Sequence, residues 1–414
     1  MLTGTNLTHA KQYNLRIVHE AIRKYGPVSR TEIARRTELS VQTVSNLAKE
    51  LLDAGLILET ERRQSGCGAP SIGLVLNPEG AFSIGLDLNR DHLTGVLVDL
   101  AGVVRQRVVL EVDFPPPDEA LELLTSTTEA LIERESLPRE RVWGVGVGIP
   151  GPMHPAPDGH GYIVNPKAFP GWHNVPLATR LRERLEIPVY LENNATAAAI
   201  GERWYGAGQH ISTFFFFHFG SGLGGGLVIQ GQPFRGSSGN AGEIGYIPTV
   251  LSSVPGAHGD SLHVGQHFSL PRLYAALRAE GFEARSPDDL ARLLGEGNRR
   301  MRDWMDTAGD YLTSLVLAVE YMFDPDAIFL GGRFPTPLLH GLMERVTRHL
   351  PVRRIVEKQT SPRLLLATAG MDAAALGVAT LPIHASFAPA LNVLLKQAKR
   401  REGARLLSHG LGGP

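Results

Sequence analysis

The sequence predicts a small N-terminal winged helix followed by a larger α/β body of two lobes. Three observations support this fold class. The first eighty residues contain three helical segments and then a strand pair, and the rest of the chain runs twice through strands, a glycine-rich turn and helices. The 414 residues are 43% hydrophobic and 20% charged, as in ordinary globular domains. We expect domains at residues 1–78, 79–206 and 207–384, with a basic tail at 385–414.

The first two helices of the predicted winged helix have clear start and stop signals. Apolar residues share one helical face over residues 14–24, and Gly26-Pro27 is a helix stop. Ser29 lies three residues before Glu32, which is the spacing of a capping box. We expect the second helix to begin there and to be short.

A third helix and a hairpin complete the motif. Ser40 is a good N-cap, apolar residues then recur at helical spacing, and Gly55 is a good C-terminal stop. Strands are expected at residues 56–60 and 71–76, joined by a connection rich in arginine and glycine. Helices at this spacing form a helix-turn-helix, and the hairpin would be its wing.

The polar face of the third helix and the hairpin connection predict a DNA-binding surface. The net charge of −1 gives no global attraction to nucleic acid, but residues 1–70 carry ten lysines and arginines against seven aspartates and glutamates. Short polar side chains suit base edges in a major groove, and cations suit phosphates. The predicted contacts are Gln42, Thr43, Ser45, Asn46, Lys49, Arg62 and Arg63. The alternative is a protein-interaction module whose polar face is only solvated.

The body alternates predicted strands and helices in two similar series. Strands are predicted at residues 82–88, 93–100, 103–112, 142–149, 188–191, 212–219, 226–230, 327–330 and 363–368, and helices at 118–134, 176–186, 194–205, 271–281, 300–323 and 371–381. Each series starts with a strand pair, which suggests a duplicated α/β unit with a cleft between the halves. This is the architecture of hexokinase and actin, a ribonuclease H-like fold.

Several short motifs follow one another in an order that resembles the ROK family of sugar kinases and repressors. They are Gly144–Pro152, Asn165-Pro166, Phe169–Trp172, Leu191–Glu202, Gly220–Gly226, Gly239–Gly245 and Gly331-Gly332. Each glycine cluster is weak evidence alone, but the order and spacing together are specific. The resemblance extends to about residue 384. A winged helix before this body resembles the ROK transcriptional repressors in particular, which implies operator DNA as a partner and a sugar as effector.

The resemblance places Asn194 where the family has its catalytic aspartate, the third residue of a Glu-Asn-Asp motif. That carboxylate accepts the hydroxyl proton of the sugar during phosphoryl transfer. An amide does not accept this proton at neutral pH, but it can still hydrogen-bond a sugar hydroxyl. We therefore expect a site that has kept recognition and lost chemistry, with no catalytic residues.

The phosphate loops of the family are only half present. The first is normally an aspartate, two glycines and a threonine, and residues 87–92 here read Asp-Leu-Asn-Arg-Asp-His. Both glycines that let backbone amides approach a phosphate are gone. The second loop survives as a residual nucleotide loop or as a hairpin turn that the fold requires, and ATP is not expected as a cofactor. Its residues are Gly220, Ser221, Gly222, Gly224 and Gly225.

The predicted sugar-binding residues are Asn193, Asn194, Glu243 and Tyr246. Vicinal hydroxyls need planar groups with paired donors and acceptors, which the amides and the carboxylate supply at positions that match the family. Tyr246 would add a hydroxyl or stack on the ring. The alternative for the two asparagines is that they cap the helix that follows, and one residue can serve each purpose.

The usual zinc site of the family is not expected. Tyr246 replaces its histidine, and the sole cysteine of the chain, Cys67, lies elsewhere. A substitute metal site is conceivable at His258, His263 and His267, but histidines in loops are more often solvated, so no metal is predicted.

The predicted function is a ligand-responsive transcriptional regulator, a repressor of carbohydrate metabolism that acts as a homodimer or homotetramer. A dimer would place two recognition helices about 34 Å apart on an operator. The alternatives are an active ATP-dependent sugar kinase with an attached DNA-binding domain, and a ligand-independent repressor. The sequence has no apolar run of about 18 residues and no secretory signal, which predicts a cytoplasmic protein without a membrane span.

Overall fold

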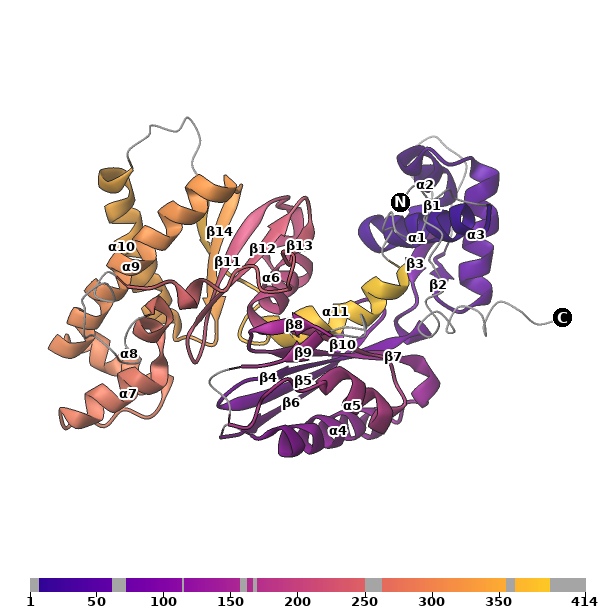
Figure 1. The fold of residues 1–414 in the computed structure, drawn as a ribbon. Coiled ribbons are helices and arrows are strands. Elements are labelled where there is room, and N and C mark those ends of the chain that lie inside the picture. Colours follow the sequence, from indigo (N-terminus) through magenta and orange to yellow (C-terminus); the bar gives the residue numbers. More distant parts are fainter. Residues whose placement is uncertain are drawn as a thin grey trace.

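The computed structural model describes residues 7–61, 72–113, 115–156, 162–166, 170–249, 263–354 and 362–387. Figure 1 shows a mostly helical N-terminal domain beside two sheets, each with its own helices. This confirms the predicted fold class of a winged helix on a two-lobed α/β body. None of the described helices is both long and apolar enough to cross a membrane.

The N-terminal domain has the predicted order of helices and strands. Its elements are α1 (Leu7–Tyr25), β1 (Val28–Ser29), α2 (Arg30–Thr37), α3 (Val41–Asp53), β2 (Ile57–Glu59) and β3 (Gly73–Leu76). The strands form an antiparallel sheet in the order β1-β3-β2. α1 is longer than the predicted helix at residues 14–24. The buried faces of the three helices meet around Val18, Ile33 and Val44.

The two helix caps differ from the prediction in one detail. The hydroxyl oxygens of Ser29 and Ser40 accept hydrogen bonds from the backbone N–H groups of Glu32 and Thr43, as expected of N-caps. The capping box at Ser29 is incomplete, because the Glu32 carboxylate pairs with arginines on its own helix, at 2.7 Å from each. The Glu32 carboxylate therefore pairs with two cations one turn away and not with the backbone N–H of Ser29.

The first lobe is built on a five-stranded sheet in the order β10-β7-β4-β5-β6. Its strands are β4 (Phe82–Leu88), β5 (His92–Asp99), β6 (Val104–Glu111), β7 (Val142–Ile149) and β10 (Val189–Asn193). β4, β5 and β6 are antiparallel neighbours, whereas β7 and β10 run parallel to β4. α4 (Pro117–Arg134) and α5 (Leu177–Leu185) cover one face. A small hairpin of β8 (Met153–Pro155) and β9 (Tyr162–Val164) follows β7.

The second lobe repeats this topology. Its strands are β11 (Phe214–Phe219), β12 (Leu223–Ile229), β13 (Gln232–Phe234), β14 (Ala327–Gly332) and β15 (Arg363–Leu366). In both sheets an antiparallel three-strand meander is extended by two parallel strands beside its first strand. The helices of this lobe are α7 (Leu270–Ala279), α8 (Pro287–Gly295), α9 (Arg299–Phe323) and α10 (Thr336–Arg353). The two lobes therefore share the same strand order and strand directions, as the predicted duplication implies.

Two helices lie between the sheets and join the lobes. α6 (Asn194–Tyr205) packs on β11 and β12 of the second lobe, and α11 (Ala373–Phe387) packs on β4 and β7 of the first. The helices also contact each other, since a Cβ on Gly377 would overlap the carbonyl oxygen of Ala197, and a Cβ on Gly201 that of Ala373. Glycine is needed at these positions for the close approach of two backbones.

α11 departs from the prediction in its length and in its place. The predicted helix ends at residue 381, before Pro382, and the predicted domain boundary lies at 384, whereas α11 runs through both to Phe387. Although it follows the second lobe in sequence, it covers the first lobe and reaches α1 (Figure 1). Ile383 and Phe387 are buried in the core of the winged helix, and this burial outweighs the lost hydrogen bond at the proline.

Candidate functional site

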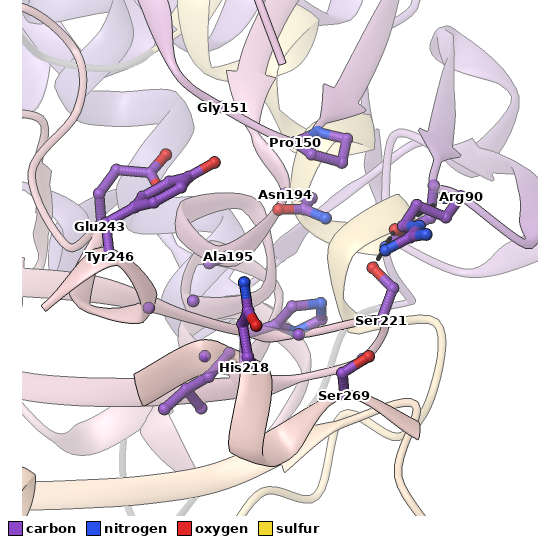
Figure 2. A pocket seen from close by; sticks show the side chains of 18 of the residues that line it. Arg90, Pro150, Gly151, Asn194, Ala195, His218, Ser221, Glu243, Tyr246 and Ser269 are labelled. Atoms are coloured by element: carbon purple, nitrogen blue, oxygen red, sulfur yellow. Dashed lines mark hydrogen bonds between the residues drawn. The ribbon is translucent and has the colours of Figure 1, made fainter. Parts of the chain in front are cut away.

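A cavity of about 700 Å³ opens between the two lobes. The turn between β4 and β5, the segment after β7 and the start of α6 form one part of its wall. The turn between β11 and β12, the segment around Glu243, residues 263–266 and the start of α7 form most of the rest. A volume of this size is typical of sites for small organic ligands, about 300–1,000 Å³. Figure 2 shows the polar side chains that face it.

The Asn193 side chain connects the start of α6 to Glu243 at one end of the cavity. Its Oδ1 accepts hydrogen bonds from the N–H groups of Ala195 at 2.9 Å and Thr196 at 3.3 Å, which caps α6. Its Nδ2 donates to Glu243 Oε1 at 2.9 Å. A side chain at position 151 would overlap the same carboxylate, so Gly151 is what allows this approach. The capping and ligand-positioning interpretations of Asn193 are thus both compatible with its geometry.

Glu243 has an unusual proton affinity for a carboxyl group. Burial raises its pKa from 4.5 to about 7, and the hydrogen bond from Asn193 opposes this rise. Tyr246 lies beside it in Figure 2, with 43% of its surface exposed. Burial and the nearby Glu243 carboxylate raise the pKa of the Tyr246 phenol. This wall therefore offers hydrogen-bond donors and acceptors for hydroxyl groups.

Asn194 is the first residue of α6 and lies between the two ends of the cavity. Its side chain is 9% exposed, and Figure 2 shows its amide between Glu243 and Arg90. Among the described residues that line the cavity, Glu243 is the sole carboxylate. Asp87, at the end of β4, is buried behind the wall with His92 Nε2 3.4 Å from its Oδ2. The structure thus brings Asn193, Asn194, Glu243 and Tyr246 to one cavity.

The two turns that correspond to the phosphate loops meet at the other end. Ser221 Oγ donates a hydrogen bond to Asn89 Oδ1 at 3.1 Å, from one lobe to the other. Gly224 and Gly225 are needed for packing, since a Cβ would lie 2.8 Å from Ala195 Cβ at the first and overlap the Phe215 ring at the second. Packing accounts for these two glycines, whereas a Cβ on Gly220 or Gly222 would make only ordinary contacts, at 3.8 Å or more.

The histidines predicted as an alternative metal site point to different partners. The ring of His263 meets Tyr246 edge-on at 6.0 Å, and the ring of His267 stacks on Tyr311 at 4.4 Å. His258 lies outside the described residues. Within the described part of the chain, no three potential metal-binding side chains come together.

The exposed face of α3 presents most of the predicted DNA contacts. Gln42, Asn46 and Lys49 are exposed, and Gln42 Nε2 donates to Asn46 Oδ1 at 3.0 Å. Thr43 is only partly exposed, and its hydroxyl lies 2.8 Å from that of Ser40 in the helix cap. Ser45 is also partly exposed. Arg62 and Arg63 lie outside the described residues.

The winged helix is docked on the body through α1. His19 stacks on Phe387 of α11 with ring centroids 3.9 Å apart, and burial lowers the pKa of this histidine to about 3. Arg23 lies 4.2 Å above the Trp204 ring of α6, and Arg16 donates to the carbonyl oxygen of Ala385 at 3.3 Å. The DNA-binding domain therefore contacts the two helices that lie between the lobes.

Sequence reasoning missed several residues of the cavity. His218, Ser269 and Arg272 line it, and no spacing pattern connects these three side chains from separate elements. Arg90 also lines it, from the turn that corresponds to the first phosphate loop. On the DNA-binding face, the sequence offered no reason to single out Val41, which is 49% exposed at the start of α3. An exposed apolar residue at the start of a recognition helix is a signal for contact with thymine methyl groups.

Comparisons with known proteins agree with this architecture. Residues 20–66 match the MarR family. A putative xylose repressor from Caldicellulosiruptor sp. is 30% identical over 340 residues, which cover 78% of this chain and 84% of the relative. The DNA-binding transcriptional dual regulator NagC from Escherichia coli is 25% identical over 341 residues, which cover 79% and 82%.

Solved structures show the same fold. The crystal structure of a ROK family transcriptional regulator, described as a homolog of the Escherichia coli MLC protein, aligns with 93% of this chain and 99% of its own, with a TM-score of 0.73 and 23% identity. The ROK family itself matches residues 83–385, which span both lobes and α11. The chain therefore belongs to the ROK family.

Proposed function

We propose that this protein is a sugar-responsive transcriptional regulator, a repressor of carbohydrate metabolism. It binds operator DNA through α3 and the wing, and it binds a sugar in the cavity without changing it chemically. The proposal rests on two features that one continuous set of packed helices connects. They are the exposed polar face of α3 and the cavity with its polar side chains. The names of the xylose repressor and NagC relatives support it.

Sugar recognition rests on the wall formed by Asn193, Asn194, Glu243 and Tyr246. Glu243 is held by the 2.9 Å hydrogen bond from Asn193, so its second oxygen can accept from a hydroxyl. The Asn194 amide can donate to one hydroxyl and accept from the next. Tyr246 is exposed enough to stack on a sugar ring that enters the cavity.

The absence of phosphoryl transfer is inferred from Asn194 and from the turn at Asn89 and Arg90. Asn194 offers an amide where a base is needed, and Glu243 lies on the far side of Asn194 from Arg90 in Figure 2. The turn at Asn89 and Arg90 carries two bulky side chains where glycine amides would hold a phosphate. The proposal therefore includes no ATP and no metal cofactor.

Sugar binding is proposed to change DNA binding through α6 and α11. A ligand that contacts both lobes favours one lobe arrangement, and the shift is limited by the difference in its affinity for the two states, commonly about 1–3 kcal/mol. In a homodimer that acts in the cytoplasm, a change at α1 would alter the spacing of two recognition helices about 34 Å apart.

Two assays test the proposal. Operator fragments are first selected from genomic DNA with the purified full chain, and their affinity is then measured by fluorescence anisotropy with and without each sugar of a panel. We expect one sugar class to change the affinity by about 5- to 150-fold. Unchanged DNA binding with every sugar, together with no heat of sugar binding in calorimetry, would favour a ligand-independent repressor instead.

The kinase alternative has its own assay. ADP release is followed with ATP and the same sugar panel, for the wild type and for Asn194→Ala. We expect no turnover above background, and we expect none for Asn194→Asp, because the turn at Asn89 and Arg90 remains unable to hold a phosphate. Turnover in the wild type that disappears in Asn194→Ala would overturn the proposed function.

A further inference from the structure

We propose that Asn240 is a positioning residue of the sugar site, and that it places Glu243 at the cavity wall by fastening the Glu243 segment to the first lobe. The inference rests on the proposed function, because it assumes that a sugar binds at this wall. Asn240 is not one of the residues that line the cavity, so it acts on the sugar through Glu243.

The Asn240 side chain is hydrogen-bonded to both main-chain groups of Met153. Its Oδ1 accepts a hydrogen bond from the Met153 N–H at 2.7 Å, and its Nδ2 donates to the Met153 carbonyl oxygen at 2.6 Å. The same Nδ2 lies 3.1 Å from Ser238 Oγ and 3.3 Å from the Ser238 carbonyl oxygen. An amide offers an acceptor and a donor in one plane, so it pairs with one residue as a neighbouring strand would.

Met153 anchors this pair to the first lobe. It is the first residue of β8, pairs with Val164 of β9, and is fully buried in the core of that lobe. Asn240 comes after β13, in the second lobe. The two hydrogen bonds therefore join the lobes between residues that are 87 positions apart in sequence.

A turn carries this attachment from Asn240 to Glu243. The N–H of Glu243 donates to the carbonyl oxygen of Asn240 at 3.4 Å, which closes a four-residue turn. Gly239, directly before this turn, has a φ of +86°, and a Cβ there would lie 2.6 Å from the Tyr162 ring of β9. The turn that presents Glu243 is therefore packed against the same β8–β9 hairpin to which Asn240 is bonded.

The groups that Glu243 contacts lie beside this anchor. Gly151 precedes Met153 by two residues, and a Cβ on Gly151 would overlap Glu243 Oε1. The same oxygen accepts the 2.9 Å hydrogen bond from Asn193 Nδ2. A small movement of the Glu243 segment away from Met153 would therefore open both contacts and let water reach the carboxyl group.

A second tie holds the start of the same segment. Arg235 Nε lies 2.6 Å from Glu192 Oε2, and the Glu192 side chain is only 2% exposed. Glu192 directly precedes Asn193, so this ion pair also lies next to the sugar wall. The segment is thus fastened to the first lobe at two points, Arg235 and Asn240, before it reaches its carboxyl group.

These ties matter for affinity because the sugar wall is built from both lobes. Asn193 and Asn194 come from the first lobe and Glu243 from the second. A wall that is already ordered in the free protein spares the ligand the free-energy cost of ordering it. Loss of the Asn240 side chain should therefore weaken sugar binding, although it removes no group that contacts the sugar.

The first test is isothermal calorimetry of the full chain with xylose, glucose and N-acetylglucosamine as probes. Asn240→Ala should weaken each probe that the wild type binds by about tenfold. Asn240→Asp keeps the size and the acceptor but has no donor for the Met153 carbonyl oxygen. It should weaken the sugar as well, and it serves as the test variant if Asn240→Ala does not fold.

The matched control is Asn298→Ala. It removes another asparagine hydrogen bond of the second lobe, in which Asn298 Oδ1 caps α9 by accepting from the Met301 N–H at 3.2 Å. This variant should lose stability and keep the sugar affinity of the wild type. Thermal unfolding checks that every variant is folded.

The second test reports on Glu243 without any sugar. Burial raises the pKa of Glu243 to about 7, so Glu243→Gln should gain stability relative to its parent as the pH rises through that value. If Asn240 keeps this carboxyl group buried, Asn240→Ala returns its pKa toward 4.5, and Glu243→Gln should gain less in that background. The gain should stay complete in the Asn298→Ala background. Scanning calorimetry from pH 4.5 to 8.5 measures these differences.

Each contrary result has a different meaning. Wild-type sugar affinity in Asn240→Ala would overturn the inference and leave the proposed function intact. An undiminished gain from Glu243→Gln in the Asn240→Ala background would also overturn it, because Glu243 would then be placed without Asn240. No binding of any probe to the wild type, together with a diminished gain, would confirm the placement of Glu243 and overturn its use for a sugar.

Discussion

Glu243 allows a quantitative test of the electrostatics of the cavity. Burial raises the pKa of this carboxyl from 4.5 to about 7, against the opposing hydrogen bond from Asn193. Between these pH values the folded protein keeps a proton that the unfolded chain has released. The stability that comes from this proton is therefore complete below pH 4.5 and is lost as the pH rises through about 7.

The size of the effect follows from the shift. Each pKa unit is worth about 1.4 kcal/mol, so the ionised carboxylate lowers the free energy of unfolding by at most about 3 kcal/mol above pH 7. Partial exposure of the side chain to solvent reduces this value. Glu243→Gln keeps an oxygen that can accept the bond from Asn193 and cannot ionise. We expect the variant to equal the wild type near pH 4.5 and to exceed it by about 1–3 kcal/mol at pH 8.

Differential scanning calorimetry from pH 4.5 to 8.5 measures this difference. The quantity of interest is the melting temperature of Glu243→Gln minus that of the wild type, which should grow with pH and level off above 7. Glu119→Gln changes an exposed glutamate of α4 and controls for the loss of one negative charge. A difference that does not depend on pH, or that falls as pH rises, would refute burial as the cause.

Gly377→Ala should lower the melting temperature, although alanine is the better helix former by about 1 kcal/mol, because the new Cβ would overlap the Ala197 carbonyl oxygen. Gly295→Ala in α8, where a Cβ meets nothing within 4 Å, is the matched control, and a stable Gly377→Ala would contradict the proposed backbone contact. In anisotropy titrations, Gln42→Ala and Asn46→Ala should each weaken the selected operator by about 1–3 kcal/mol and relax its base preference. Equal weakening on random DNA would argue against a base contact. Lys49→Ala should weaken all duplexes alike and reduce the salt slope by about 1, and an unchanged slope would remove it from the phosphate contacts.

Most of the fold was predictable because its signals are local. Caps at Ser29 and Ser40, alternating apolar runs and glycine turns specify each element within a few residues. α11 was predicted too short because its last turns depend on distant partners. A proline normally ends a helix, and only the position of α1 makes the burial of Ile383 and Phe387 favourable. Thr43 was predicted as a DNA contact from its helical position alone, which does not show that its hydroxyl lies 2.8 Å from that of Ser40 in the cap.

The candidate site was predictable where a motif connects residues, and not elsewhere. Asn193 and Glu243 are fifty residues apart and hydrogen-bonded, and the order of the glycine motifs placed both at one site. Ser269 and Arg272 carry no such pattern, since any capped helix can start with serine and carry an arginine. Only the tertiary fold brings them to the cavity.

The backbone contact between α6 and α11 explains how an event in the cavity can reach the DNA-binding domain. α6 begins at Asn194 in the cavity, and α11 ends at Phe387 against His19 of α1. Because Gly201 and Gly377 bring the two backbones together, there are few side-chain rotamers between the helices that could absorb a movement. A displacement of α6 by a ligand is therefore expected to move α11 and α1 with it. In a dimer that movement changes the distance between two copies of α3, and the half-site spacing of an operator is sensitive to that distance.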